Sequence, residues 1–168
     1  MAGGHNADAL QLLEADHRLV ESLADRYLAL SANEARSTRG RWLADEICLV
    51  LTIHTRLVQE LVHPAARSAL EDDEVVDDND AEHERTRELV GKLFAARGDD
   101  PLRDAKVAVL REAFMSLVRH EREQLFPRLR ESPLDLRALA RSTALRKEEL
   151  KAVADALRED VLAASLTA

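Results

Sequence analysis

Cysteine, proline and glycine are all scarce in this chain of 168 residues. The one cysteine, Cys48, cannot form an internal disulfide bond, which is compatible with a reducing compartment. We expect its thiol to pack as a small buried apolar group. Only four prolines and five glycines interrupt a sequence that is rich in alanine, leucine, arginine and glutamate. This composition predicts helix almost throughout and a single domain of ordinary size.

Long apolar runs and an excess of positive charge are also missing. No stretch approaches the roughly 18 apolar residues of a membrane-spanning helix, and the first ten residues, MAGGHNADAL, lack the basic and apolar segments of a secretion signal. The formal net charge of -8 repels phosphate groups on average. We therefore expect a cytoplasmic protein that binds neither nucleic acid nor membrane. The high alanine, arginine and leucine content hints at a bacterial source.

Apolar residues recur at spacings of three and four along four long segments, which predicts amphipathic helices. The first helix is capped by Asn6 or Asp8 and ends before a polar break at residues 31–40. The other three are expected at about residues 41–70, 81–97 and 102–130. We interpret the acidic run at residues 71–80 as a solvated loop whose last residue, Asp80, starts the third helix. The stop before the fourth helix is expected at residues 98–101.

The four segments predict an all-α fold, an antiparallel up-down four-helix bundle. We assign residues 1–132 to this bundle and residues 133–168 to a C-terminal helical extension packed on or near it. The extension is expected as one helix over residues 134–162, with a break near Ser142 and Thr143 left open. Its role is packing or contact with a second copy, so a homo-oligomer is left open.

A weak internal repeat joins the second and fourth helices. Residues 54–67, HTRLVQELVHPAAR, align with residues 117–130, LVRHEREQLFPRLR, when Pro64 is placed on Pro127. In both copies an aliphatic residue and a ring residue come before the proline, and an arginine follows three residues later. The repeat therefore fixes the register of the two helices relative to each other.

Each copy of the repeat holds half of an H-x-x-x-E motif. Ten residues before the proline the first copy has His54 and the second has Leu117, and six residues before it the first copy has Val58 and the second has Glu121. A full motif would place an imidazole and a carboxylate on one helix face, where both could bind one metal ion. The pattern indicates a metal site in which half of the ligands are missing.

Each of the four helices offers one candidate ligand on its apolar face. These candidates are His17, His54, His83 and Glu121. A single histidine on an apolar face is more often a hydrogen-bonded core residue. Four such groups from four helices are costly to bury unless something pairs with them, and a metal cation does so most fully. Of the other histidines, His63 aligns with a phenylalanine and is expected to pack like an aromatic ring, while His120 is left open at the edge of the core.

These motifs resemble those of the hemerythrin-like HHE cation-binding domains over nearly the whole chain. The likeness depends on the segments EADHRLVESL, EICLVLTIHTRLVQELVHPAAR, DAEHERTRELV and DAKVAVLREAFMSLVRHEREQLFPRLR, and on the tail SPLDLRALARSTALRKEEL. Members of that family hold two irons in a four-helix bundle, bridged by oxygen and by two carboxylates from the second and fourth helices. The resemblance therefore implies the bundle fold and a cation site.

Residue by residue, the resemblance assigns one iron to His17 and His54, with Glu121 as a bridging carboxylate and His83 as a ligand of the other iron. Where the family has a glutamate and a histidine, this chain has Val58 and Leu117. The departures imply a degenerate site that holds one iron rather than two, with zinc, manganese or no metal as alternatives. Such a site needs neutral imidazoles, so it should release metal below about pH 6.

Three functions are consistent with these residues. The first is binding or sensing of a metal ion, or of oxygen, nitric oxide or peroxide at the metal. The second is a metal-free structural or protein-interaction bundle with a repacked former di-iron site, and the third is a mononuclear iron enzyme. We see no second acid-base group or nucleophile that would name a substrate, so enzyme activity is left open with a non-enzymatic role preferred.

Overall fold

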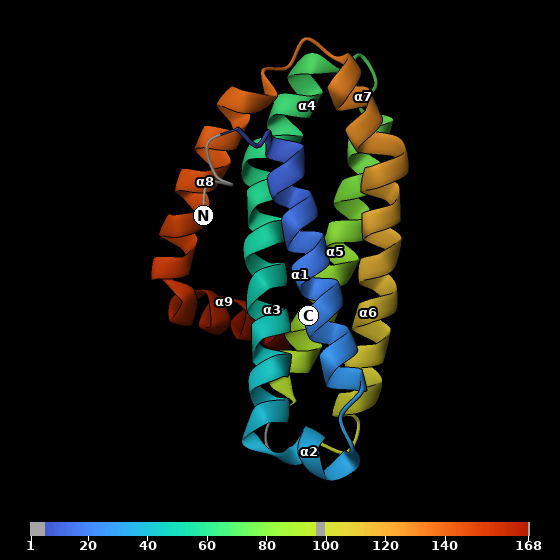
Figure 1. Cartoon of the computed structure of the whole chain (residues 1–168), viewed down its shortest axis with the longest axis vertical. Coiled ribbons are helices and arrows are strands. Elements are labelled where there is room, and N and C mark those ends of the chain that lie inside the picture. Colours follow the sequence, from blue (N-terminus) through green and yellow to red (C-terminus); the bar gives the residue numbers. More distant parts are fainter. Residues whose placement is uncertain (1–5, 97–99, 168) are drawn as a thin grey trace.

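The computed structural model describes residues 6–96 and 100–167, and within these ranges every regular element is a helix. The four bundle helices are α1 (Ala9–Leu28), α3 (Thr38–Leu57), α5 (Glu74–Ala95) and α6 (Arg103–His120). They lie side by side along the long axis of the molecule, and each reverses the direction of the one before (Figure 1). The all-α, antiparallel four-helix bundle predicted from the sequence is confirmed. No helix in the described part of the chain is both long and apolar enough to cross a bilayer.

The first helix begins at a reciprocal cap. The Asp8 carboxylate accepts a hydrogen bond from the backbone N–H of Gln11 at 2.9 Å, and the Gln11 side chain accepts one from the N–H of Asp8, also at 2.9 Å. The two bonds satisfy donors that the first turn of a helix leaves without partners. Of the two caps that the sequence allows, Asp8 is the one used, and it fixes where the buried face of α1 starts.

The polar segment at residues 31–40 is not the simple break that the sequence predicted. It contains a short helix, α2 (Ala32–Arg36), capped by Ser31 and Glu34, and α3 already begins at Thr38 rather than at Arg41. Gly40 allows α2 to pack this closely, because a Cβ atom at residue 40 would lie 2.1 Å from the carbonyl oxygen of Ala35. The two helices therefore meet backbone to backbone.

Both proline-ended helices carry a π-helical turn just before the proline. The second helix continues as η1 (Val58–Val62) and α4 (His63–Ala69), and the fourth as η2 (Glu121–Leu125) and α7 (Phe126–Glu131). The backbone N–H of His63 bonds to the carbonyl of Val58, and that of Phe126 bonds to the carbonyl of Glu121. Each bond spans five residues instead of four, and the proline that follows has no N–H to restore the α-helical pattern. The internal repeat is thus a repeat of structure.

The prediction of a solvated acidic loop up to Asp80 was wrong. The third bundle helix starts at Glu74, seven residues earlier than expected. Val75 and Val76 are buried in the core, which offsets the polarity of their neighbours. Glu74 and Asp77 lie in the first turn, where the helix dipole favours negative charge. The expected helix end at Arg97 and the stop at Gly98 and Asp99 lie outside the described residues.

The C-terminal extension forms two helices rather than one. These are α8 (Leu136–Ala152) and α9 (Ala154–Thr167), so the break lies at Val153 and not near Ser142 and Thr143. In Figure 1, α8 runs along the outside of α3 and the chain then turns sharply into α9. Leu150 and Leu157, one from each helix, are buried against Ile53 and Leu57 of α3.

Candidate metal centre

Four side chains, one from each of the four long helices of the bundle, meet in the interior. Glu121, the first residue of η2, receives all three histidines on its carboxylate. His17 Nε2 lies 2.6 Å from Oε2, His54 Nε2 lies 3.8 Å from the same oxygen, and His83 Nε2 lies 2.9 Å from Oε1. All four side chains are at most 1% exposed. The four residues singled out in the sequence therefore share one buried cluster.

Three of these residues point ligand atoms at a common position. His17, His54 and Glu121 each offer one atom, and the three atoms lie within 4.8 Å of one another. His17 Nε2, His54 Nε2 and Glu121 Oε2 lack hydrogen-bond partners, because even the 2.6 Å contact does not have hydrogen-bond geometry. Buried polar atoms without partners are costly, and a cation between them would satisfy all three. The donor set therefore fits a metal ion.

His83 has a different environment, because both of its ring nitrogens are hydrogen-bonded. Nε2 faces Glu121 Oε1, and Nδ1 lies 3.1 Å from the Thr55 hydroxyl oxygen. Burial lowers the pKa of His83, although the neighbouring carboxylate raises it, so the ring is neutral near pH 7. In that state the Nε2–H donates to Glu121 while Nδ1 accepts from Thr55. The ring thus fixes one carboxylate oxygen and leaves the other, Oε2, facing His17 and His54.

The charges in the cluster favour a cation. Burial by itself raises the pKa of Glu121, but the three histidine rings that face the carboxylate outweigh it and hold the pKa well below its usual range. Burial lowers the pKa of His54, but the carboxylates of Asp16 and Glu121 outweigh it and raise the value to about 9. Without a metal, His54 therefore keeps a proton at neutral pH between two buried carboxylates. A bound metal ion would take over the role of that positive charge.

Two charged residues, Asp16 and Lys147, lie on the Nδ1 side of the His54 ring, away from Glu121. Asp16 on α1 is 3% exposed, and its Oδ2 lies 3.5 Å from His54 Nδ1. Its other oxygen accepts a hydrogen bond from the ammonium group of Lys147, which comes from α8. Burial raises the pKa of Asp16, but the His54 ring and the Lys147 ammonium lower it, so the carboxylate stays charged. Neither residue was predicted from the sequence, because Asp16 lies beside the apolar stripe of α1 and Lys147 belongs to a polar C-terminal segment.

Aromatic and aliphatic groups close the site. The His17 ring stacks on Phe126 at a centroid distance of 5.9 Å, and Phe114 meets it edge-on at the same distance. Val58 and Leu117, which stand where the resemblance expects ligands, are both fully buried and apolar. The cluster therefore has no donor atoms from those two positions and lies in surroundings of low polarity.

His63 and His120, the other histidines of the second and fourth helices, do not belong to the group of possible metal ligands formed by His17, His54 and Glu121. His63 packs edge-on to His83 with centroids 5.7 Å apart, as expected for an aromatic-type position, and its Nε2 lies 2.8 Å from Asn79 Oδ1. His120 is half-buried, and its Nδ1 lies 3.4 Å from the amide nitrogen of Asn79. Asn79 thus bridges these rings, and neither residue points a ligand atom at the cluster.

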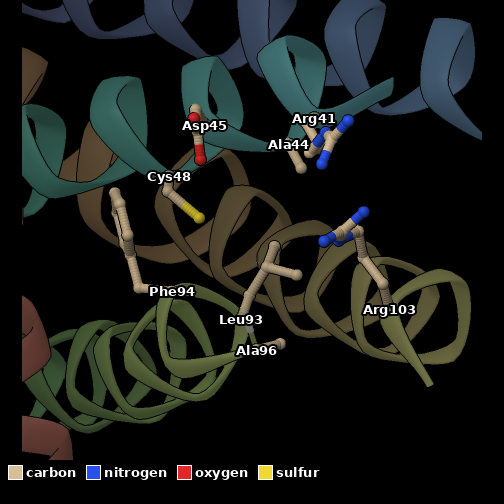
Figure 2. Close-up of a pocket in the computed structure, with 8 residues that line it drawn as sticks. All are labelled: Arg41, Ala44, Asp45, Cys48, Leu93, Phe94, Ala96 and Arg103. Atoms are coloured by element: carbon tan, nitrogen blue, oxygen red, sulfur yellow. The ribbon is translucent and has the colours of Figure 1, made fainter. Parts of the chain in front are cut away.

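A separate hollow of about 220 Å³ lies between α3, α5 and α6. Figure 2 shows Arg103 reaching from α6 toward Arg41 across it, with Cys48 facing the interior. Cys48 is buried in the main core cluster, as expected from the sequence. The residues that line the hollow include none of the clustered histidines and not Glu121. It is therefore distinct from the candidate metal centre.

The antiparallel bundle encloses two imidazole rings and a carboxylate whose ligand atoms lack hydrogen-bond partners. This arrangement is typical of helical cation-binding proteins, which hold the ion between their helices. The hemerythrin HHE cation-binding domain matches residues 8–129, and the chain belongs to this family. The match covers α1 to α6 and η2, which carry all four clustered residues, and stops before α8. Comparisons with curated proteins and with solved structures gave no match.

Proposed function

We propose that this protein holds one metal ion between His17, His54 and Glu121, and binds or senses a small ligand at that ion. The observation that carries the proposal is the set of three converging buried atoms without hydrogen-bond partners. Two imidazoles and one carboxylate suit a single iron(II), with zinc and manganese as alternatives. His83 supports the set by holding the second oxygen of Glu121.

A single ion is favoured over two by what surrounds His83. A second ion beside it would need further donors, and Val58 and Leu117 supply none. The two ring nitrogens of His83 are already engaged, one by Thr55 and one by Glu121. The chain can thus complete one site from its own residues, whereas a second site would have to displace existing hydrogen bonds.

Three protein ligands leave coordination positions open, which iron(II) can offer to oxygen, nitric oxide or peroxide. The protein itself orients the donors and excludes water. Phe114 and Phe126 lie against His17 and close the site around its ring, so that a large ligand would have to displace them. No second acid-base pair stands free in the cluster to process a larger substrate. Binding or sensing therefore suits the site better than turnover.

Metal content after reconstitution tests the proposal. Chain treated with chelator, loaded with iron(II) under nitrogen or with zinc, and then desalted should retain about one ion per chain. Glu121→Gln should reduce the content to near zero, because the amide keeps the shape but removes the charge that the cation needs. His63→Gln serves as the matched control, since His63 is another buried histidine beside His83 and should leave the content at one.

Two results would count against the proposal. Wild-type protein that retains no metal would favour the alternative, a metal-free structural or protein-interaction bundle with a repacked site. Equal loss of metal in Glu121→Gln and His63→Gln would place the ion elsewhere. Nitric oxide binding to the iron(II) form, followed by its visible absorption, then tests the small-ligand part separately.

A further inference from the structure

We infer that the C-terminal helix α8 is a working part of the metal centre, through Lys147, which positions Asp16 and thereby the ring of His54. The inference rests on the proposed function above. The hemerythrin match ends at residue 129, so it assigns no role to α8. Lys147 touches none of the proposed ligands and acts as a positioning residue, one step removed from the metal.

The geometry of Asp16 carries the argument. The two oxygens of its carboxylate have different neighbours. Oδ1 accepts a hydrogen bond from the Lys147 ammonium group, and Oδ2 lies 3.5 Å from His54 Nδ1. A neutral histidine that binds metal through Nε2 carries its proton on Nδ1. The Asp16 carboxylate makes no hydrogen bond to His54 Nδ1, but its negative charge at 3.5 Å favours that tautomer and this orientation of the ring. Lys147 holds one oxygen in place and so directs the other toward the ring.

Burial explains why the lysine is needed. The Asp16 side chain is only 5% exposed, and a carboxylate at such a place is costly without a positive partner. Lys147 is 28% exposed, so its charged end reaches inward while its stem lies along the surface of the bundle. Without the ammonium group, one Asp16 oxygen would lose its partner and the carboxylate could turn away from His54. The ligand Nε2 would then be held less firmly toward Glu121 Oε2.

The residue before Lys147 provides a matched control. Arg146 also ties α8 to the bundle, with hydrogen bonds of 2.7 and 3.3 Å to the carboxylate of Glu60 in η1. Glu60 contacts none of the proposed ligands through any hydrogen bond or ion pair described for it. Both substitutions therefore loosen α8 in a similar way, but only the loss of Lys147 reaches His54. A comparison of the two separates positioning from simple docking of the helix.

The experiment measures zinc affinity of the full-length protein by competition with a chromophoric chelator, together with the visible spectrum of the cobalt(II) form. Lys147→Met should weaken zinc binding by about 10-fold, the low end of the range for partners of metal ligands. The cobalt bands should shift, because the His54 ring changes orientation. Lys147→Arg should restore affinity to within about threefold of the wild type, and Arg146→Met should stay within about twofold.

A double variant tests whether Lys147 acts through Asp16. If Lys147 acts through Asp16, then adding Lys147→Met to Asp16→Asn should cause no further loss of affinity. Equal losses in Arg146→Met and Lys147→Met, or independent losses from Asp16 and Lys147, would overturn the inference. Unchanged affinity in Lys147→Met would overturn it alone and leave the metal site intact, whereas a wild type that binds no zinc or cobalt would overturn both proposals.

Discussion

Glu121 concentrates the chemistry of this protein in one side chain. It is a fully buried carboxylate at the first residue of a π-helical turn, and three imidazole rings from three other helices face it. In the π turn the N–H of Phe126 bonds to the carbonyl of Glu121, which closes a ring one residue wider than that of an α-helix, and such turns often occur at functional sites. The equivalent π turn in the second helix starts at Val58. Both copies of the repeat therefore have the π turn, but only the second copy has a carboxylate at its first residue.

Tyr27 allows a pH prediction far from the metal centre. Its buried hydroxyl donates to Asp104 at 2.8 Å, and both burial and that carboxylate raise the pKa of Tyr27 above its usual range. The stabilisation that goes with this raised pKa is fully present below about pH 10, the pKa of a tyrosine in the unfolded chain. It is lost as the pH rises from there toward the pKa of Tyr27 in the folded protein. We expect Tyr27→Phe to cost about 1 kcal/mol near pH 7.

The free energy of unfolding, measured with urea in the presence of chelator, checks this. The difference in unfolding free energy between the wild type and Tyr27→Phe should narrow as the pH rises from about 9 to about 12. Only the wild type has a phenol group, and this group loses its proton at a lower pH in the unfolded chain than in the folded protein. A gap that stays constant or widens over that interval would show that the Tyr27–Asp104 hydrogen bond is not responsible.

At the scale of elements, the contact between α2 and α3 depends on one missing side chain. A methyl group at residue 40 would overlap the backbone of Ala35, which cannot yield as a flexible side chain could. We expect Gly40→Ala to destabilise the fold by about 2 kcal/mol, despite the better helix propensity of alanine. Thermal or urea unfolding measures this, and Arg39→Ala, one residue earlier on an exposed face of α3, should change stability by less than about 0.5 kcal/mol. A neutral or stabilising Gly40→Ala would mean that α2 does not pack here.

The sequence predicted the bundle helices and their inward faces well, for a clear physical reason. His17, His54 and Glu121 lie on apolar stripes with helical spacing, so their direction follows from the local pattern alone. The start of α5 was missed because two buried valines outweigh the acidic residues around them, and burial is a tertiary effect. The short α2 was missed because five residues carry too little periodicity to indicate a helix.

The second layer of the site could not be predicted from local patterns. Asp16 lies next to a stripe residue, and its partner Lys147 is 131 positions away in the sequence. Their meeting depends on how α8 crosses α1, which amphipathic spacing does not determine. Likewise, the hydrogen bond between Thr55 and His83 depends on the exact rotation of two neighbouring helices. Sequence periodicity gives the face of a residue but not its partner.

At the scale of the whole molecule, we propose that residues 1–132 form the bundle and residues 133–168 an extension that the bundle needs for stability. Leu150 and Leu157 are buried against Ile53 and Leu57, so a chain that ends at residue 132 would expose these apolar groups. Burying one such side chain contributes about 1.5–3 kcal/mol, so we expect the shortened chain to lose at least about 3 kcal/mol.

Urea unfolding of the metal-free chains measures that loss, and size-exclusion chromatography shows whether the exposed patch causes association. A shortened chain that matches the full chain in stability would indicate that the extension is dispensable for the fold. The metal-free state is used so that any loss of metal affinity through Lys147 does not enter the comparison.

We propose that one metal ion lies between the three converging ligand atoms of His17, His54 and Glu121. Anomalous diffraction from crystals of the zinc- or iron-loaded protein tests it most directly. We expect one anomalous peak per chain, about 2.0–2.2 Å from His17 Nε2, His54 Nε2 and Glu121 Oε2. Two peaks, a peak elsewhere, or no peak in fully loaded crystals would contradict it.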